Sequence, residues 1–465
     1  MGKDQSGQAG QEQRRAGRSP LGTVAKIVSG RANRGRPKRQ PTPEEQSEAR
    51  VLRFALQGTA AGLLPGERVA RCLRSQVPTA QSVDVQYVSE THSSHYCNLQ
   101  VCSSVWHCPM CAAKISERRR IELQTLISKH VAAGGSVYMA TYTIRHGRFD
   151  DLADLLHRFL AARRKMRQGR RGQALRSDFG VIGTVSVLEV TWSVENGWHP
   201  HTHELIFSMG EIDITGYEKV VRLAWSDAAA ANGLEMNEHG FKLDRTYGAV
   251  ADYIAKFGHE PATDRPWGTE TEMVKGHLKQ GREGRGEKHY TPFALLRSIH
   301  EGADDLADKF IEYARCFKGR KQLTYSPGLK AFYAEEEKTD EEVMQEHEHE
   351  AVTLVELFPE QWEQVLGNDI RGELLESARS GRPGEVINFL SQFGITLYPD
   401  QVKRFEGWQV MTPEGLGRVS TVSYCDIFNR WRCSVYLDEA KEGTVWRAFD
   451  LVEVSMDVLV TENAS

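Results

Sequence analysis

Three histidines occupy alternate positions in one short run of the chain, at His199, His201 and His203. Because side chains along a β-strand alternate between its two faces, all three imidazoles would project to the same side of a strand. Neutral imidazoles that converge from a rigid strand can bind a divalent metal. The preceding Asn196-Gly197 pair is a strong hairpin signal, so we predict two strands joined there. The alternative is a polar strand face that binds no metal.

Glu189, on the preceding strand, is the natural oxygen ligand to accompany these imidazoles. With a two-residue turn at Asn196-Gly197, His203 would face Val190 and the Glu189 side chain would point to the other face. A loop one residue longer moves Glu189 to the metal side, because a one-residue slip exchanges the two faces. Pro200 cannot donate a ladder hydrogen bond, so we expect an edge or bulged strand, where such a slip is tolerated. We therefore predict Glu189 as a ligand.

Half of the eight cysteines fall within fifteen residues, at Cys97, Cys102, Cys108 and Cys111. In a chain without a secretory signal, this spacing favours a tetrahedral zinc site over disulfides. A redox pair or a chance cluster is the alternative, and His92, His95 or His107 could replace one thiolate. Four sulfur ligands leave no open coordination position, so we predict a structural zinc. The remaining cysteines are predicted to be ordinary reduced residues: Cys72, Cys316, Cys425 and Cys433.

A candidate nucleophile follows downstream, in a run from Tyr247 to Phe257 with helical periodicity. Tyr253 and Lys256 lie three residues apart and so share one helix face. A helical tyrosine is usually a packing residue. Downstream of a metal-binding strand, however, it could attack a phosphorus atom polarised by the metal and form a phosphotyrosyl link.

The rest of the chain must supply the elements that position these residues. With 465 residues, 40% hydrophobic and 26% charged, it has room for two or three soluble domains. No apolar run approaches the roughly 18 residues of a membrane span, so we expect a cytoplasmic protein without a membrane partner. Strands are predicted near 135–146 and on both sides of Asn196, and helices over 150–169 and 215–232.

Basic residues gather on two of the predicted helices, although the formal net charge is -4. One group follows the cysteines and the other ends the helix over 150–169. Clustered arginines suit phosphate contacts, and a solvated basic face is the alternative. The residues predicted to contact DNA are Arg118, Arg119, Arg120, Arg163 and Arg164.

These motifs follow one another along the chain in a recognisable order: Trp106-His-Cys-Pro-x-Cys111, Thr141-x-Thr143, Leu188-Glu-Val-Thr191, His199-Pro-His-x-His203-Glu-Leu and Tyr253-x-x-Lys256. In this order the chain resembles plasmid rolling-circle replication initiators of the HUH endonuclease superfamily. The resemblance runs from about Cys97 to Lys330.

The resemblance implies an enzyme that nicks one strand at the double-strand origin of a plasmid. It would stay attached to the 5′ phosphate through Tyr253, with Lys256 beside it, leave a 3′-OH primer and later rejoin the displaced strand. His201 and His203 would be the metal ligands, with Glu189 third and His199 an extra neighbour. The ion would be Mg²⁺ or Mn²⁺. The partners would be origin DNA, double-stranded and single-stranded, and the host helicase and replication machinery.

Two positions depart from the family pattern. Thr202 stands where a bulky apolar residue is usual between the two metal-binding histidines. Ala249 stands one turn before Tyr253, where some family members place a glutamate that activates water to end replication. Neither Asp252 nor Tyr247 lies on the face of Tyr253. The chemistry of termination is therefore left open.

The expected fold class is α+β, an HUH endonuclease fold with a central antiparallel sheet flanked by helices. Its predicted regions are a disordered basic arm (1–50), a helical segment with the zinc module (51–125), the nuclease domain (126–330), an acidic linker with helices (331–400) and a small SH3-like, barrel-like β domain (401–465). Two alternative functions are an HUH transposase and a zinc-containing DNA-binding regulator without catalysis.

Overall fold

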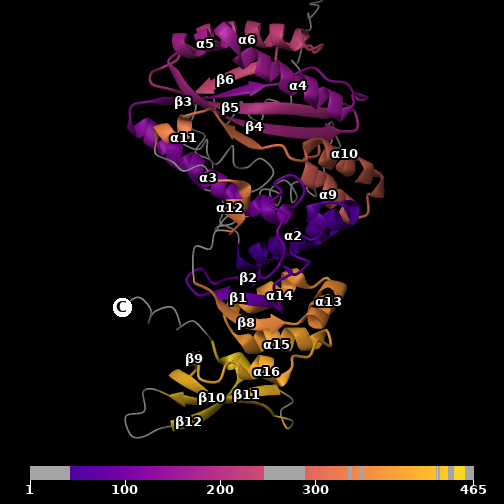
Figure 1. Ribbon diagram of the computed structural model, residues 1–465, viewed down its shortest axis with the longest axis vertical. Helices are drawn as coiled ribbons and strands as arrows, with labels where there is room; N and C mark the ends of the chain where they lie inside the picture. Colours follow the sequence, from indigo (N-terminus) through magenta and orange to yellow (C-terminus); the bar gives the residue numbers. More distant parts are fainter. Residues whose placement is uncertain are drawn as a thin grey trace, which may run out of the picture.

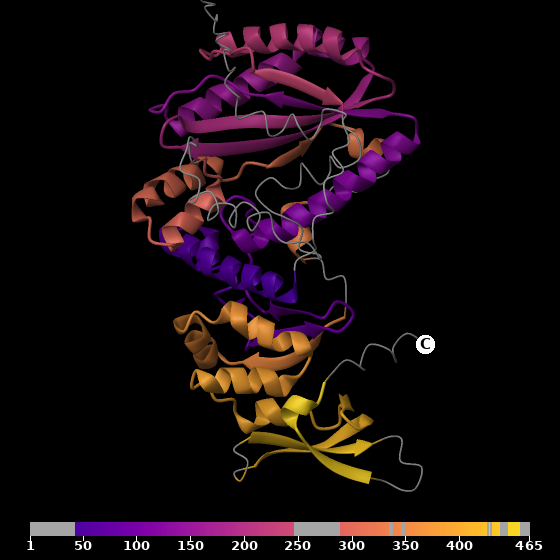
Figure 2. The same ribbon diagram turned by 180° about the vertical axis from the view of Figure 1, so that it is seen from behind.

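The computed structural model describes residues 42–245, 289–333, 338–345, 350–425, 427, 430–437 and 445–455. Within them the chain forms three sheets, and every strand pairing is antiparallel. The mixed α+β class predicted from the sequence is therefore confirmed. Figures 1 and 2 show the sheets spaced along the long axis of the molecule, the largest at one end. Among the described helices, none combines the length and apolar character that a membrane span requires.

The largest sheet has five strands in the order β6-β3-β5-β4-β7. The long hairpin of β4 and β5 forms its centre, as the Asn196-Gly197 signal predicted, and β3 and β7 flank this hairpin. The strands are β3 (Ser136–Tyr142), β4 (Val181–Ser193), β5 (Gly197–Ser208), β6 (Phe241–Arg245) and β7 (Leu323–Tyr325).

Helices α4 and α6 cover one face of this sheet (Figure 1). Both were predicted from apolar periodicity, and α4 begins at an Asp151 cap whose carboxylate accepts the Asp154 amide hydrogen. Trp225 and Phe159 are completely buried between the helices and the sheet. The helices on this side are α4 (Leu152–Arg167), α5 (Gly169–Asp178) and α6 (Ile214–Ala230).

The other face of the sheet is covered in part by α3 (Pro109–Ala132). Leu123 and Leu126 of α3 pack against Val187, Leu205 and Phe207, all at odd-numbered strand positions. Because side chains alternate, the histidines of β5 lie on this same odd face. The helix also runs through the boundary at residue 125 that the sequence suggested, so it links the cysteine cluster directly to the sheet.

A three-stranded sheet joins parts of the chain that lie far apart in the sequence. Its order is β2-β1-β8, formed by β1 (Val83–Val88), β2 (Ser93–Cys97) and β8 (Val352–Leu357). From the sequence, the last of these segments was assigned to the acidic linker with helices (331–400). Buried and half-buried side chains alternate only partly along this segment, so its sequence carries no clear strand pattern. The strand is defined by its antiparallel pairing with β1.

The first described helix, α2 (Pro43–Leu63), is continuous and extends into the segment that the sequence predicted to be helical. A capping box between Thr42 and Glu45 starts it, and Pro43 takes the first position, where a missing amide hydrogen costs nothing. Packing of its buried face then outweighs the helix-weakening Gly58 and Gly62. Residues 43–50 are thus helical, although they were assigned to the basic arm.

The helices after β7 pack around the five-stranded and the three-stranded sheets. They are α9 (Pro292–His300), α10 (Ala307–Phe317), α11 (Leu329–Phe332), α12 (Asp340–Gln345), α13 (Pro359–Gly367), α14 (Arg371–Ser377), α15 (Pro383–Gln392) and α16 (Pro399–Lys403). Arg371 is completely buried, and its guanidinium donates to Gln57 Oε1 at 2.6 Å and to the carbonyl of Leu73 at 3.1 Å. It therefore fastens α14 to α2, and its hydrogen bonds offset part of the cost of burying the guanidinium.

The last sheet is a four-stranded meander in the order β12-β11-β10-β9. The short β-runs predicted near the end of the chain are confirmed as β9 (Gln409–Thr412), β10 (Gly415–Cys425), β11 (Arg430–Leu437) and β12 (Val445–Asp450). An isolated bridge pairs Met411 with Ser455. The described strands thus form an antiparallel sheet, whereas closure into an SH3-like barrel stays a prediction.

Candidate metal centres

The register of the β4–β5 hairpin places Glu189 directly opposite His201. The last pair before the turn is Ser193 with Gly197, so the loop comprises residues 194–196 and not Asn196-Gly197. Gly197 is needed at the start of β5 because it has a φ of +71° and because a Cβ there would lie 2.8 Å from the carbonyl oxygens of Gly147 and Arg148. The altered register brings Glu189 to the histidine face.

Pro200 lies in a central strand, not in the edge or bulged strand that was expected. The pairing of β5 with β3 begins only at Thr202, so residue 200 has a strand neighbour on one side alone, at Val190. The missing amide hydrogen therefore costs no ladder bond with β3. Within β4–β5, the register shift is at Val181/Gly183, far from the turn.

Glu189, His201 and His203 form a compact group of three potential ligands. His201 Nε2 lies 3.0 Å from Glu189 Oε2, and His203 Nε2 lies 3.8 Å from Glu189 Oε1. The three ligand atoms all lie within 4.8 Å of one another. Glu189 Oε1 is buried and has no hydrogen-bond partner among the described residues. A buried carboxylate oxygen without a donor is costly, and a cation between the three residues would satisfy it.

Hydrogen bonds to the far nitrogens orient both imidazoles toward Glu189. His203 Nδ1 lies 3.0 Å from Thr141 Oγ1 on β3, and His201 Nδ1 lies 3.1 Å from the carbonyl oxygen of His199. If each Nδ1 carries the hydrogen, each Nε2 directs a lone pair toward Glu189, the direction in which a metal would bind. Thr141, in the Thr141-x-Thr143 strand of the sequence motif, therefore orients a candidate metal ligand.

Burial sets the ionisation of this group. It raises the pKa of Glu189 to about 7 and lowers the pKa of His203 well below its ordinary value. For His201 burial also acts against the charged form, but the hydrogen bond and the charge of Glu189 raise its pKa overall. The low pKa of His203 keeps its ring neutral, as metal binding requires. The donor set of one carboxylate and two imidazoles suits Mn²⁺, and Mg²⁺ less strongly.

His199 lies beside this group without belonging to it. Its ring stacks against that of His201 at 5.0 Å between centroids, while its other side contacts His146 at 4.6 Å. All three histidines lie on one strand face, as predicted. Only His201 and His203 belong to the group of potential metal ligands.

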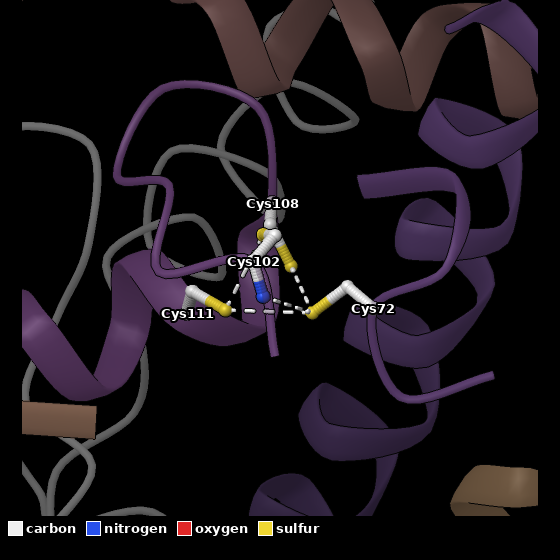
Figure 3. A group of neighbouring side chains, drawn as sticks. All are labelled: Cys72, Cys102, Cys108 and Cys111. Carbon is white, nitrogen blue, oxygen red and sulfur yellow. Dashed lines mark hydrogen bonds between the residues drawn. The ribbon is translucent and has the colours of Figure 1, made fainter. Parts of the chain in front are cut away.

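The cysteine cluster consists of Cys72, Cys102, Cys108 and Cys111, all buried (Figure 3). Cys72 Sγ lies 3.7 Å from that of Cys108 and 3.5 Å from that of Cys111, and the Cys102 and Cys111 sulfurs are 3.6 Å apart. A tetrahedron with zinc–sulfur bonds of about 2.3 Å has edges of about 3.8 Å. The four sulfurs are therefore spaced to fit a zinc ion.

Cys72 takes the place that sequence spacing gave to Cys97. Cys97 ends β2 and its thiol lies 2.9 Å from Gln86 Oε1 on β1, outside the cluster. The turn after α2 brings Cys72 in, because Gln57 Nε2 donates to the carbonyls of Val69 and Cys72. A single cysteine thirty positions before the motif gives no local sequence signal of this.

None of the three histidines proposed as substitutes completes the cysteine cluster. His107 Nε2 lies 2.9 Å from the carbonyl oxygen of Ala314, and His92 Nδ1 lies 2.8 Å from the Tyr87 hydroxyl. His95 belongs to β2, opposite Gln86.

Burial also raises the pKa of Cys108 well above its ordinary value, so its thiol needs a cation to lose its proton. A thiol-binding metal such as zinc would provide that cation.

The predicted DNA-contacting arginines differ in their accessibility. Arg163 is buried, 2.8 Å from Glu204, with its guanidinium over the Tyr142 ring at 3.5 Å. It forms part of the core and cannot contact DNA from there. Arg119 pairs with Glu122 and Asp340, and Arg120 pairs with Glu117.

Of the five predicted arginines, Arg164 alone is exposed, on α4, and Arg118 on α3 belongs to the same half-buried class as Arg119 and Arg120. Tyr253 and Lys256, and with them Tyr247, Ala249 and Asp252, lie outside the described residues.

Two curated proteins are similar to the chain. A protein named Protein rep, from Streptomyces lividans, is 25% identical over 300 residues, which cover 50% of this chain and 63% of the relative. A Neomycin resistance protein of Streptomyces cyanogenus is 25% identical over 136 residues, covering 24% of this chain and 31% of the relative. The chain thus spans less than two thirds of either relative. No family model matches it, and no solved structure does.

Proposed function

We propose that the protein initiates rolling-circle replication of a plasmid by nicking one strand of the origin and later rejoining it. The observation that carries this proposal is the Glu189, His201 and His203 group on two central strands. Three ligands leave coordination positions for a phosphate, as catalytic metal sites require. The similarity to a protein named Protein rep supports the same function.

Glu189, His201 and His203 would hold Mg²⁺ or Mn²⁺, which when bound supplies positive charge to the scissile phosphate. Thr141 and the carbonyl of His199 keep the two imidazoles in the orientation that binding needs. The rigid sheet then fixes where the phosphate must sit, so that a nucleophile can approach it in line.

Tyr253 is our proposed nucleophile, on the strength of the Tyr-x-x-Lys motif alone. Its phenolate oxygen forms a bond to phosphorus while the bond from phosphorus to the 3′ oxygen breaks. The 5′ phosphate stays on the tyrosine, and the departing 3′ oxygen takes up a proton and becomes the primer hydroxyl. Attack by a 3′-OH on the phosphotyrosine reverses these bonds and rejoins the strand. Lys256 would stabilise the phenolate.

The cysteine cluster would have a structural role in this enzyme. A zinc ion bound to all four sulfurs would have no open coordination position. Cys108 and Cys111 lie at the start of α3, whose far end packs on the catalytic sheet. Zinc there would hold the helix and the turn after α2 together.

The decisive experiment uses the full chain, Mn²⁺ and a labelled single-stranded oligonucleotide that spans the nick site of the origin. A denaturing gel reports a covalent protein–DNA adduct for the wild type, for Tyr253→Phe and for the matched control Tyr247→Phe. We expect an adduct that disappears in Tyr253→Phe and without Mn²⁺ but persists in Tyr247→Phe. Specific binding of the origin by the wild type without any adduct would instead identify a non-catalytic regulator.

A further inference from the structure

We propose that the loop of residues 145–150 extends the metal site into a contact for single-stranded DNA, in which Phe149 stacks on an unpaired base. This inference rests on the proposed function, because it takes the substrate of the metal site to be a DNA strand. It assigns a binding role to residues that no motif of the sequence marks.

The loop is fastened to the turn between β4 and β5. His146 Nδ1 lies 2.8 Å from the carbonyl oxygen of Asn196 in that turn. The carbonyls of Gly147 and Arg148 lie so close to Gly197 that no side chain would fit there. Within the loop, the Gly147 amide donates to the Asp150 carboxylate at 2.8 Å. These contacts fix the loop at the end of the hairpin that carries the metal ligands.

A row of imidazoles connects the loop to the metal ligands. Its ring centroids are 4.6 Å apart from His146 to His199, 5.0 Å from His199 to His201 and 5.2 Å from His201 to His203. The row follows one face of β5, so a strand bound along it would pass from the loop to the metal. The rings lie at 53°, 31° and 89° to one another, so they form a continuous line of contacts and leave base stacking to the exposed residues of the loop.

Phe149 follows His146 by three residues in the same loop, and 91% of its surface is exposed, the largest fraction of any large hydrophobic residue described. Arg148 lies over its ring, with Cζ 5.5 Å from the centroid. Val194, on the adjoining hairpin loop, is also exposed, at 46%. An exposed aromatic ring with an arginine is the combination that proteins use to hold single strands: the ring stacks on a base and the cation contacts the backbone.

The test measures binding of fluorescein-labelled oligothymidylate to the full chain by anisotropy, with Mn²⁺ omitted so that no strand is cut. We expect Phe149→Ala to weaken binding roughly tenfold, within the range for loss of one stacked base. Phe149→Trp should restore it. The matched control is Phe332→Ala, which removes another exposed phenylalanine, 62% exposed on α11. It should bind as the wild type does.

A second variant separates stacking from charge. Arg148→Gln should lower the slope of log affinity against log salt by about 0.7, the value for one phosphate contact on a single strand. Phe149→Ala should leave that slope unchanged. Binding by Phe149→Ala within twofold of the wild type would overturn the inference and leave the ring for a protein partner. An equal loss in Phe332→Ala, or no rescue by tryptophan, would overturn it as well.

The adduct assay is scored separately from this binding. A protein that needs Phe149 to bind DNA but forms no adduct keeps the loop contact and loses the nicking function. Adduct formation together with unchanged binding by Phe149→Ala would support the nicking function and overturn the loop contact.

Discussion

The two candidate metal centres are built in opposite ways. The four cysteines come from a turn, a loop and the start of a helix. Cys72 Sγ lies 3.7 Å from the Cys108 sulfur and 3.5 Å from the Cys111 sulfur, and it accepts a hydrogen bond from the backbone amide of Cys102. Glu189, His201 and His203 instead come from two paired strands, and backbone hydrogen bonds hold them in register. A metal would add bonds between these loop segments, whereas the sheet needs no metal to keep its register.

The two centres also differ in their number of ligands. Four thiolates complete the shell of zinc and exclude any substrate, while one carboxylate and two imidazoles leave room for a phosphate. We therefore expect loss of the first metal to change the fold, and loss of the second to change only the chemistry.

The largest effect is expected from Cys72→Ser. Loss of one of four zinc ligands should abolish stoichiometric zinc binding and lower the melting temperature by about 10 °C or more, because metal binding free energy is folding free energy. Zinc content by atomic absorption and a thermal melt measure both. The matched control is Cys97→Ser, which should keep its zinc. If Cys97→Ser loses the metal and Cys72→Ser does not, the cluster has been assigned to the wrong four residues.

His203→Ala should act on chemistry alone. We expect adduct formation to fall by a factor of about 100 or more, since removal of a metal ligand also removes the charge at the scissile phosphate. Zinc content and melting temperature should stay near those of the wild type. His199→Ala is the control, because this ring lies beside the ligand group, and it should keep most of the activity. Unfolding of His203→Ala would show that the fold depends on both centres alike.

Thr141→Val tests the hydrogen bond that orients His203. The two side chains have similar shapes, but valine cannot accept a hydrogen bond from Nδ1. We expect Mn²⁺ to bind about 10- to 100-fold more weakly, the usual cost of losing such a support. Titration of adduct formation with Mn²⁺ measures this, and saturating metal should restore the rate. A lower rate that no Mn²⁺ concentration restores would give Thr141 a different role.

The sequence predicted the parts of these sites that depend on local periodicity. The alternation of His199, His201 and His203 was sufficient to place them on one strand face. Glu189 depended on the hairpin register, which three loop residues determine and which Asn196-Gly197 suggested wrongly. Local spacing also selected Cys97, the nearest cysteine to the motif, although the fold selects Cys72.

Long-range pairing explains the other differences. β8 has no clear alternation because both of its faces are packed, and it is recognisable only through its partner β1. The glycines in α2 favour breaks when the helix is considered alone, but tertiary packing overrides propensity. Arg163 looks like part of a basic surface in sequence, yet Glu204 and Tyr142 make it a core residue.

The pairing of β1 with β8 also sets an order of events during synthesis. Gln86 and Thr353, whose side chains are hydrogen-bonded across these strands, lie 267 residues apart in the chain. At about 5–20 residues per second, the ribosome needs roughly ten to fifty seconds to cover that distance. Until then the β1–β2 hairpin presents an unpaired strand edge, the kind of surface on which chains aggregate. The five-stranded sheet, whose strands are all made earlier, can fold before that edge is covered.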